Sequence, residues 1–131
     1  MKKHKDDKKR FSLAMRAKSL SHAARGLSVF FRTTHNAWVQ LTVLAVVILA
    51  GLYFQISYLE WLLIILVSGF VLAAEAFNTA IEIAVDLTSP EYHPYARDTK
   101  DVAAAAVLIS AITATLVGIM LFGHHILDAA R

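Results

Sequence analysis

Apolar residues in this chain are gathered into three long runs that polar segments separate. The runs cover approximately residues 38–54, 61–85 and 102–122. A helix crosses the hydrocarbon core of a bilayer with roughly 17 to 25 predominantly apolar residues, so each run predicts one transmembrane helix. Trp38 and Tyr53 flank the first run, where aromatic anchors at the two membrane surfaces are expected.

Two polar segments precede the first run. Residues 1–10, MKKHKDDKKR, predict a basic disordered tail. The tail is short and has no interleaved aromatic residues, so it does not indicate binding to nucleic acid. Residues 11–31 alternate apolar and basic groups, which predicts an amphipathic helix at the membrane interface. A helix packed inside a soluble domain is the alternative reading of that segment.

Composition and charge agree with one membrane domain. Hydrophobic residues make up 57% of the chain, whereas soluble domains average about 45–50%. Cysteine is absent, which excludes disulfides, zinc–thiolate sites and cysteine nucleophiles. Lys and Arg are concentrated before residue 33 and recur in the expected loop 86–101, while residues 55–60 contain none. The positive-inside rule then places the N-terminus and the 86–101 loop in the cytoplasm. We therefore expect an all-α membrane domain over residues 11–131.

Polar side chains follow one side of the second predicted span. Counted from Glu75, they lie at offsets 0, 3, 4, 7 and 11, and they are Glu75, Asn78, Thr79, Glu82 and Asp86. At about 100° per residue they form one stripe of a helix. An ionisable residue inside a span costs roughly 2.5–3.5 kcal/mol on insertion scales, so the acidic stripe is a functional candidate.

Charged residues after the second span extend this chemistry. Carboxylates beside an amide suit Mg²⁺, which prefers oxygen ligands. Lys100 and Asp101 stand at the foot of the third run, where a lysine can meet a phosphate group. A metal, a cation and a base are the parts that phosphoryl transfer needs. The chain has no Walker A motif, so a nucleotide site here must be of another kind.

The string EAFNTAIEIAVD, followed by SPEYHP and KD, resembles the small prokaryotic lipid kinases. That family contains diacylglycerol kinase and undecaprenol kinase, and the resemblance covers about residues 11–122. It implies a homotrimer of three-span protomers, each with a surface helix, in the bacterial cytoplasmic membrane. It also implies transfer of the γ-phosphate of ATP, with Mg²⁺, to the hydroxyl of a lipid alcohol, at a site that faces the cytoplasm.

The resemblance assigns roles to individual residues. Glu75 matches the general base that takes the proton from the lipid hydroxyl, and Glu82 matches a metal ligand that also serves the nucleotide. The other positions that match nucleotide-binding residues are Asn78, Asp86, Glu91, Tyr92, His93, Lys100 and Asp101.

The chain departs from the family pattern in its surface helix and just before the first span. Thr34 stands where many members carry a second metal-binding glutamate, and His35, Asn36 or a water are possible substitutes. Met15 and His22 occupy positions that can contact nucleotide in relatives, and we assign them no role.

A non-enzymatic oligomer with a proton or ion pathway along the stripe is the alternative function. It leaves Lys100, Asp101 and the segment 91–93 unexplained. A haem-bearing anchor needs axial histidines within its spans, and all six histidines lie outside the three runs. His124 and His125 are expected only as interfacial residues beyond the third span.

Overall fold

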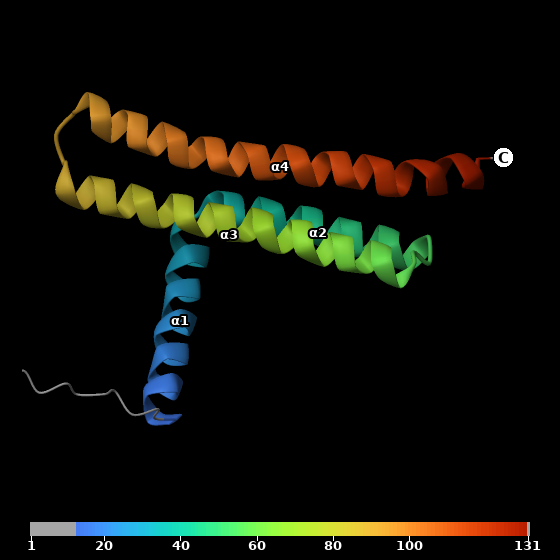
Figure 1. Cartoon of the computed structure of the whole chain (residues 1–131), viewed down its shortest axis with the longest axis horizontal. Coiled ribbons are helices and arrows are strands. Elements are labelled where there is room, and N and C mark those ends of the chain that lie inside the picture. The colour runs from blue at the N-terminus through green and yellow to red at the C-terminus, as the bar shows by residue number, and fades with distance from the viewer. Residues whose placement is uncertain (1–12, 131) are drawn as a thin grey trace, which may run out of the picture.

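The protein is all-helical in the computed structural model, which describes residues 13–130. The expected tail 1–10 and the start of the expected interfacial helix at Phe11 lie outside the described residues. The helices are α1 (Leu13–Thr33), α2 (His35–Tyr53), α3 (Tyr58–Thr88) and α4 (Pro94–Ala129). α3 and α4 run side by side in opposite directions, and α2 lies along α3. α1 projects away from these three helices at a steep angle to them (Figure 1). The helical fold class is confirmed, and α2, α3 and α4 are each long and apolar enough to cross a membrane.

The turn between α2 and α3 is closed by a capping box. The Ser57 hydroxyl accepts a hydrogen bond from the Glu60 N–H, and the Ser57 N–H donates to Glu60 Oε2 at 2.6 Å. Glu60 lies before the apolar segment that begins at Trp61. Hydrogen bonds with Ser57 lower the pKa of Glu60 to about 2, and the bond from the Ser57 backbone has a larger effect than the one with its side chain. Glu60 is therefore a carboxylate at neutral pH.

The turn between α3 and α4 is much shorter than the sequence suggested. The expectation of a loop over residues 86–101 is wrong, because α3 continues to Thr88 and α4 begins at Pro94. Pro94 occupies the first position of α4, where the missing N–H of proline costs nothing and its fixed φ favours the helix. His93 caps this end by accepting a hydrogen bond from the Tyr95 N–H at 3.2 Å.

α4 also extends beyond the expected third span. The third span was expected over residues 102–122, but the helix continues to Ala129. Residues 123–129 are polar only at their histidines and Asp128 and contain no proline, so nothing local ends the helix there. His124 and His125 are therefore helical residues with fixed directions.

A small cluster of buried apolar residues lies at the α2–α3 turn. Ile56, Ile64 and Leu121 form it, and Phe54 and Trp61 pack against it. Gly51 is needed here, because a Cβ atom at this position would lie 2.8 Å from the Trp61 ring. The apolar side chains of the three long helices are otherwise largely exposed. So much exposed apolar surface requires an apolar surrounding, either lipid or further protein.

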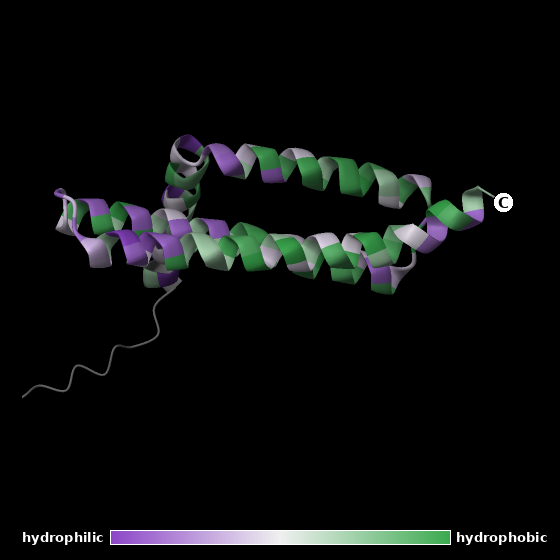
Figure 2. Ribbon diagram, turned by 90° about the horizontal axis from the view of Figure 1, so that it is seen from above, coloured by the Kyte–Doolittle hydropathy of each residue, from purple (hydrophilic) through white to green (hydrophobic). Residues whose placement is uncertain are grey.

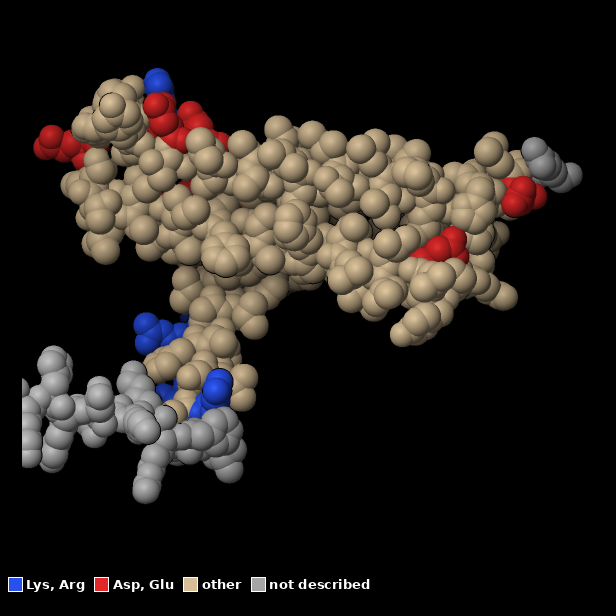
Figure 3. All heavy atoms as spheres, in the orientation of Figure 1, with Lys and Arg blue, Asp and Glu red and all other residues tan. Residues whose placement is uncertain are grey.

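Polarity also changes along the length of the helices. The middle of the bundle is hydrophobic, whereas hydrophilic residues gather at the end that holds the α3–α4 turn (Figure 2). Acidic side chains lie at both ends of the α3–α4 pair, and basic ones project from α1 (Figure 3). The ends of the bundle thus carry the charges, as expected of helices whose middle lies in a bilayer.

Candidate active site

Glu75 is buried at the contact between α2 and α3. Its residue is 2% exposed, and the Gln40 amide donates a hydrogen bond from Nε2 to Glu75 Oε2 at 3.3 Å. α3 brings the acid to this depth and α2 supplies the donor. A buried carboxylate is costly unless it is hydrogen-bonded, so Gln40 is the partner that makes this position tolerable within the chain.

Two threonines connect the start of α2 to the stripe. The Thr79 hydroxyl donates to the Glu75 carbonyl oxygen at 3.0 Å and lies 2.8 Å from the Thr34 hydroxyl. Because the Thr79 proton is already used, Thr34 is the donor of the second bond. Thr34 caps α2 by position but not through its side chain, which is engaged on α3. Thr34 thus lies against the stripe at Thr79, which is about one helical turn before Glu82.

Asn78 and Glu82 form an amide–carboxylate pair one turn apart. Asn78 Nδ2 donates to Glu82 Oε1 at 3.1 Å. The other side-chain atom, Asn78 Oδ1, is buried and is one of only two such atoms in residues 13–130 that lack a hydrogen-bond partner. An unpartnered amide oxygen beside a carboxylate suits a hard cation such as Mg²⁺, which takes oxygen ligands. The residues present therefore fit the metal that the sequence predicts.

Asp86 and Lys100 face each other across the α3–α4 turn. Their ion pair is 2.5 Å long, with the side chains 67% and 37% exposed. Asp101 follows on α4 and is exposed. The short turn brings the start of α4 back beside the end of the stripe, so a cation stands close to the acidic groups.

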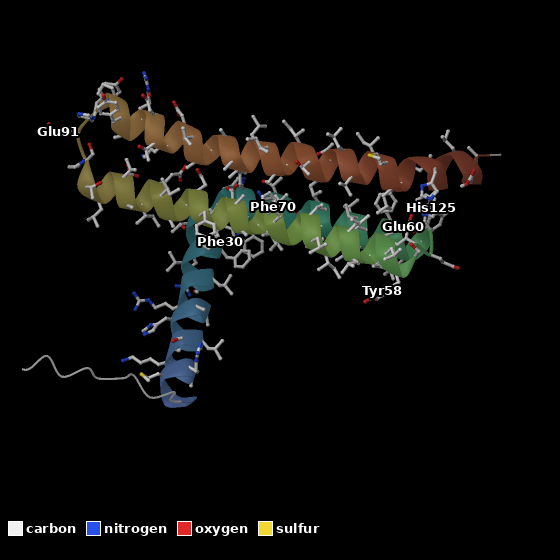
Figure 4. The ribbon with its side chains drawn as sticks, viewed as in Figure 1. Phe30, Tyr58, Glu60, Phe70, Glu91 and His125 are labelled. Carbon is white, nitrogen blue, oxygen red and sulfur yellow. The ribbon has the colours of Figure 1, made fainter. Side chains whose placement is uncertain are left out.

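The residues of the turn itself are exposed. Glu91 lies at its tip, away from the bundle (Figure 4). Tyr92 accepts a hydrogen bond from Arg97 at 3.5 Å, and His93 is held by its capping bond to Tyr95. These three positions border the same end of the molecule as Lys100.

The structure gathers most of the predicted residues at one end of the bundle. Glu82 lies seven residues after Glu75, or ~10 Å along α3. Asp86 lies eleven residues after Glu75, or ~16 Å along the same helix. Gln40 was not predicted as a site residue. It is a lone amide in an apolar run, and that polarity was the only signal that could have identified it.

The sequence model of the prokaryotic diacylglycerol kinase family matches residues 21–122. Undecaprenol kinase of Bacillus subtilis is 35% identical over 121 residues, which are 92% of this chain and 94% of the relative. Diacylglycerol kinase of Helicobacter pylori strain 26695 is 38% identical over 102 residues, 76% of this chain and 78% of the relative. Both the family match and these identities extend over the α3 stripe and the start of α4. The chain therefore belongs to the prokaryotic diacylglycerol kinase family.

Proposed function

We propose that the protein transfers the γ-phosphate of ATP to the hydroxyl of a membrane lipid alcohol. Family membership makes the chain a lipid kinase. The proposal adds the donor, the residues and the order of events. The observation that carries it is the pair of acidic positions on α3. One is the buried Glu75 carboxylate with its Gln40 donor, and the other is the Asn78–Glu82 pair ~10 Å nearer the α3–α4 turn.

Glu75 acts as the general base in this proposal. Its carboxylate accepts the proton of the lipid hydroxyl while the hydroxyl oxygen bonds to the γ-phosphorus of ATP. The bond from that phosphorus to the bridging oxygen breaks, and ADP leaves with the electron pair. Gln40 is a positioning residue, because its amide donates the hydrogen bond that holds the Glu75 carboxylate.

Glu82 and Asn78 would hold Mg²⁺, which neutralises charge on the phosphates when it is bound. Lys100 is proposed to bind phosphate as a point charge, and Asp86 holds its ammonium group beside the stripe. Asp101 and the exposed residues Glu91, Tyr92 and His93 are proposed to border the nucleotide. The Thr34 hydroxyl is engaged with Thr79, which argues against Thr34 as the replacement for the missing second glutamate.

An apolar groove between α2 and α4 is the proposed place of the lipid chain. Its floor is α3, and its volume is about 680 Å³. It exists because the backbones of α2 and α4 both lie along α3 and, within residues 13–130, do not approach each other. Gln40 lines the groove and contacts Glu75, so a lipid in the groove would present its hydroxyl toward the base.

The proposed setting is the bacterial cytoplasmic membrane, with the N-terminus and the active site on the cytoplasmic side. Arg97 and Lys100 at the α3–α4 turn, against a 55–60 turn without Lys or Arg, support this orientation. The basic α1 helix would then lie at the cytoplasmic interface. A homotrimer is proposed because much apolar surface stays exposed on one chain. Chemical cross-linking in native-like bilayers should yield trimers, and monomers alone would contradict it.

Diacylglycerol and undecaprenol both present one hydroxyl, and the relatives named above act on one or the other by name. The test is ATP consumption by purified protein in lipid nanodiscs, with each lipid added separately. We expect consumption to rise with one of the two and a phosphorylated lipid to accumulate. A non-enzymatic proton pathway predicts no lipid-dependent consumption with either.

A further inference from the structure

Three metal-ligating side chains meet at the end of the bundle opposite the proposed active site. Glu60 lies in the first turn of α3, and His124 and His125 lie in the last turns of α4. Glu60 and His125 point toward one another in Figure 4. Glu60 precedes Glu82 by 22 residues of one helix, or ~33 Å, so the kinase chemistry proposed above does not use this cluster.

In both histidines the Nε2 atom faces the same carboxylate oxygen, Glu60 Oε1. His125 Nε2 lies 3.0 Å and His124 Nε2 lies 3.6 Å from Glu60 Oε1. One atom from each residue falls within 4.8 Å of the other two. Tetrahedral Zn²⁺ with ligands at about 2.0–2.2 Å separates its ligand atoms by about 3.3 Å. The two observed separations bracket that value, so an ion between these atoms requires only small side-chain shifts.

Neighbouring groups hold the donors in place. The other carboxylate oxygen, Glu60 Oε2, accepts the hydrogen bond from the Ser57 N–H, which leaves Oε1 to face the histidines. The His125 ring stacks on Phe54, with ring centroids 5.8 Å apart and planes 25° apart. Phe54 itself packs against the core at the α2–α3 turn. Outer contacts of this kind orient the ligands of metal sites in proteins.

The burial of the three residues fits a site with an open side. The side chains of Glu60 and His125 are 19% and 22% exposed, whereas that of His124 is 54% exposed. Three protein ligands and a solvent-facing fourth position are a common arrangement for zinc bound by two histidines and a carboxylate. Imidazole nitrogen favours borderline metals such as Zn²⁺ and Co²⁺, while Mg²⁺ and Ca²⁺ require oxygen ligands.

We propose that Glu60, His124 and His125 form a Zn²⁺ site that joins the start of α3 to the end of α4. The ion bridges the two longest helices at the end where each leaves the apolar core. In the orientation proposed above, the site faces the outside of the cell and is separate from the Mg²⁺ site at Glu82. Its role is to hold α3 and α4 together at the end where no turn connects them.

The test uses the full chain, purified without a polyhistidine tag and freed of metal with a chelator. Co²⁺ is titrated while its visible absorption is followed, and Zn²⁺ is then added in competition. We expect one tetrahedral Co²⁺ ion per chain, identified by its intense visible bands, which Zn²⁺ displaces and excess Mg²⁺ does not. Zn²⁺ should also raise the unfolding temperature, and a chelator should reverse that rise.

Variants locate the ion. His125→Ala should abolish the tetrahedral spectrum, and His124→Ala should weaken binding at least tenfold. His22→Ala, a histidine on α1, and Glu82→Gln, an acid of the other site, should keep both the spectrum and the affinity. His124 is the most exposed ligand, so its variant decides the question even if His125→Ala fails to fold, with circular dichroism as the check of folding. Absence of saturable binding, or equal binding by wild type and His124→Ala, would overturn the proposal and leave Glu60–His125 as a hydrogen bond only.

Discussion

The Gln40 amide on α2 donates a hydrogen bond to the Glu75 carboxylate on α3, across 35 positions of sequence. The bond is 3.3 Å long and lies where α2 and α3 meet. Gln40 Oε1 is the second buried side-chain atom in residues 13–130 that lacks a hydrogen-bond partner. The donor side of the Gln40 amide thus serves Glu75, while its buried acceptor oxygen remains available to a ligand.

Gln40→Leu should lower kcat while leaving KM for ATP unchanged. Leucine has a similar volume but cannot hold the carboxylate, and a hydrogen bond to a charged group is worth roughly 1.5–3 kcal/mol, or about 10- to 100-fold in rate. The residues proposed to bind ATP lie toward the α3–α4 turn and keep their positions. Steady-state kinetics with varied ATP would check this split. Thr42→Val, one half-turn further along α2, is the matched control and should behave as wild type. A rise in KM for ATP with unchanged kcat would contradict the positioning role.

Glu82→Gln should raise the Mg²⁺ concentration needed for half-maximal activity. The amide keeps the shape and removes the charge from the oxygen ligand that the metal prefers. The measurement is initial rate against free Mg²⁺ at fixed ATP. Asp98→Asn removes a charge from the same end of the molecule, on an exposed side chain paired with Arg97, and should leave the curve in place. If the Glu82 variant also follows the wild-type curve, Glu82 is not a metal ligand.

Lys100→Met should weaken ATP binding without destabilising the protein. An exposed ion pair such as Lys100–Asp86 contributes roughly 0.2–1 kcal/mol to the free energy of unfolding, so its loss alone is a small effect. We expect a several-fold higher KM for ATP and an unfolding temperature close to that of wild type. Arg97→Met, which removes the other cation near the start of α4, serves as the comparison. A lowered unfolding temperature with unchanged KM would show that Lys100 is structural.

The sequence predicted which segments are helical better than where those helices end. Long apolar runs dominate the energetics of a membrane helix, so three such helices could be predicted from the positions of these runs alone. Their ends depend on capping, and Pro94 shows the difficulty. A proline ends a helix from inside but begins one at its first position, and the His93 cap and the packing of α4 on α3 decide between these outcomes.

The candidate site was predictable where its residues share one helix. Helical spacing alone puts Glu75, Asn78 and Glu82 on one side, and the structure pairs the last two directly. Contacts between helices were not predictable. Gln40–Glu75 and Glu60–His125 join positions 35 and 65 residues apart, and no local pattern encodes which turn of one helix faces which turn of the next.

Glu75→Gln tests the central claim most directly. The variant keeps the shape of the side chain and its hydrogen bond to Gln40, but it removes the base. General-base catalysis contributes typically 10²–10⁴-fold, so turnover should fall on that order. Helicity, insertion and ATP binding should remain.

The measurement is transfer of labelled γ-phosphate from ATP to the lipid in nanodiscs, by wild type, Glu75→Gln and the control Asp128→Asn, an acid at the opposite end of the molecule. The account predicts wild-type rates for Asp128→Asn and a loss of at least a hundredfold for Glu75→Gln. Lipid phosphorylation by Glu75→Gln within a few-fold of wild type would contradict it, and Asp101 would then be the next residue to test as the base.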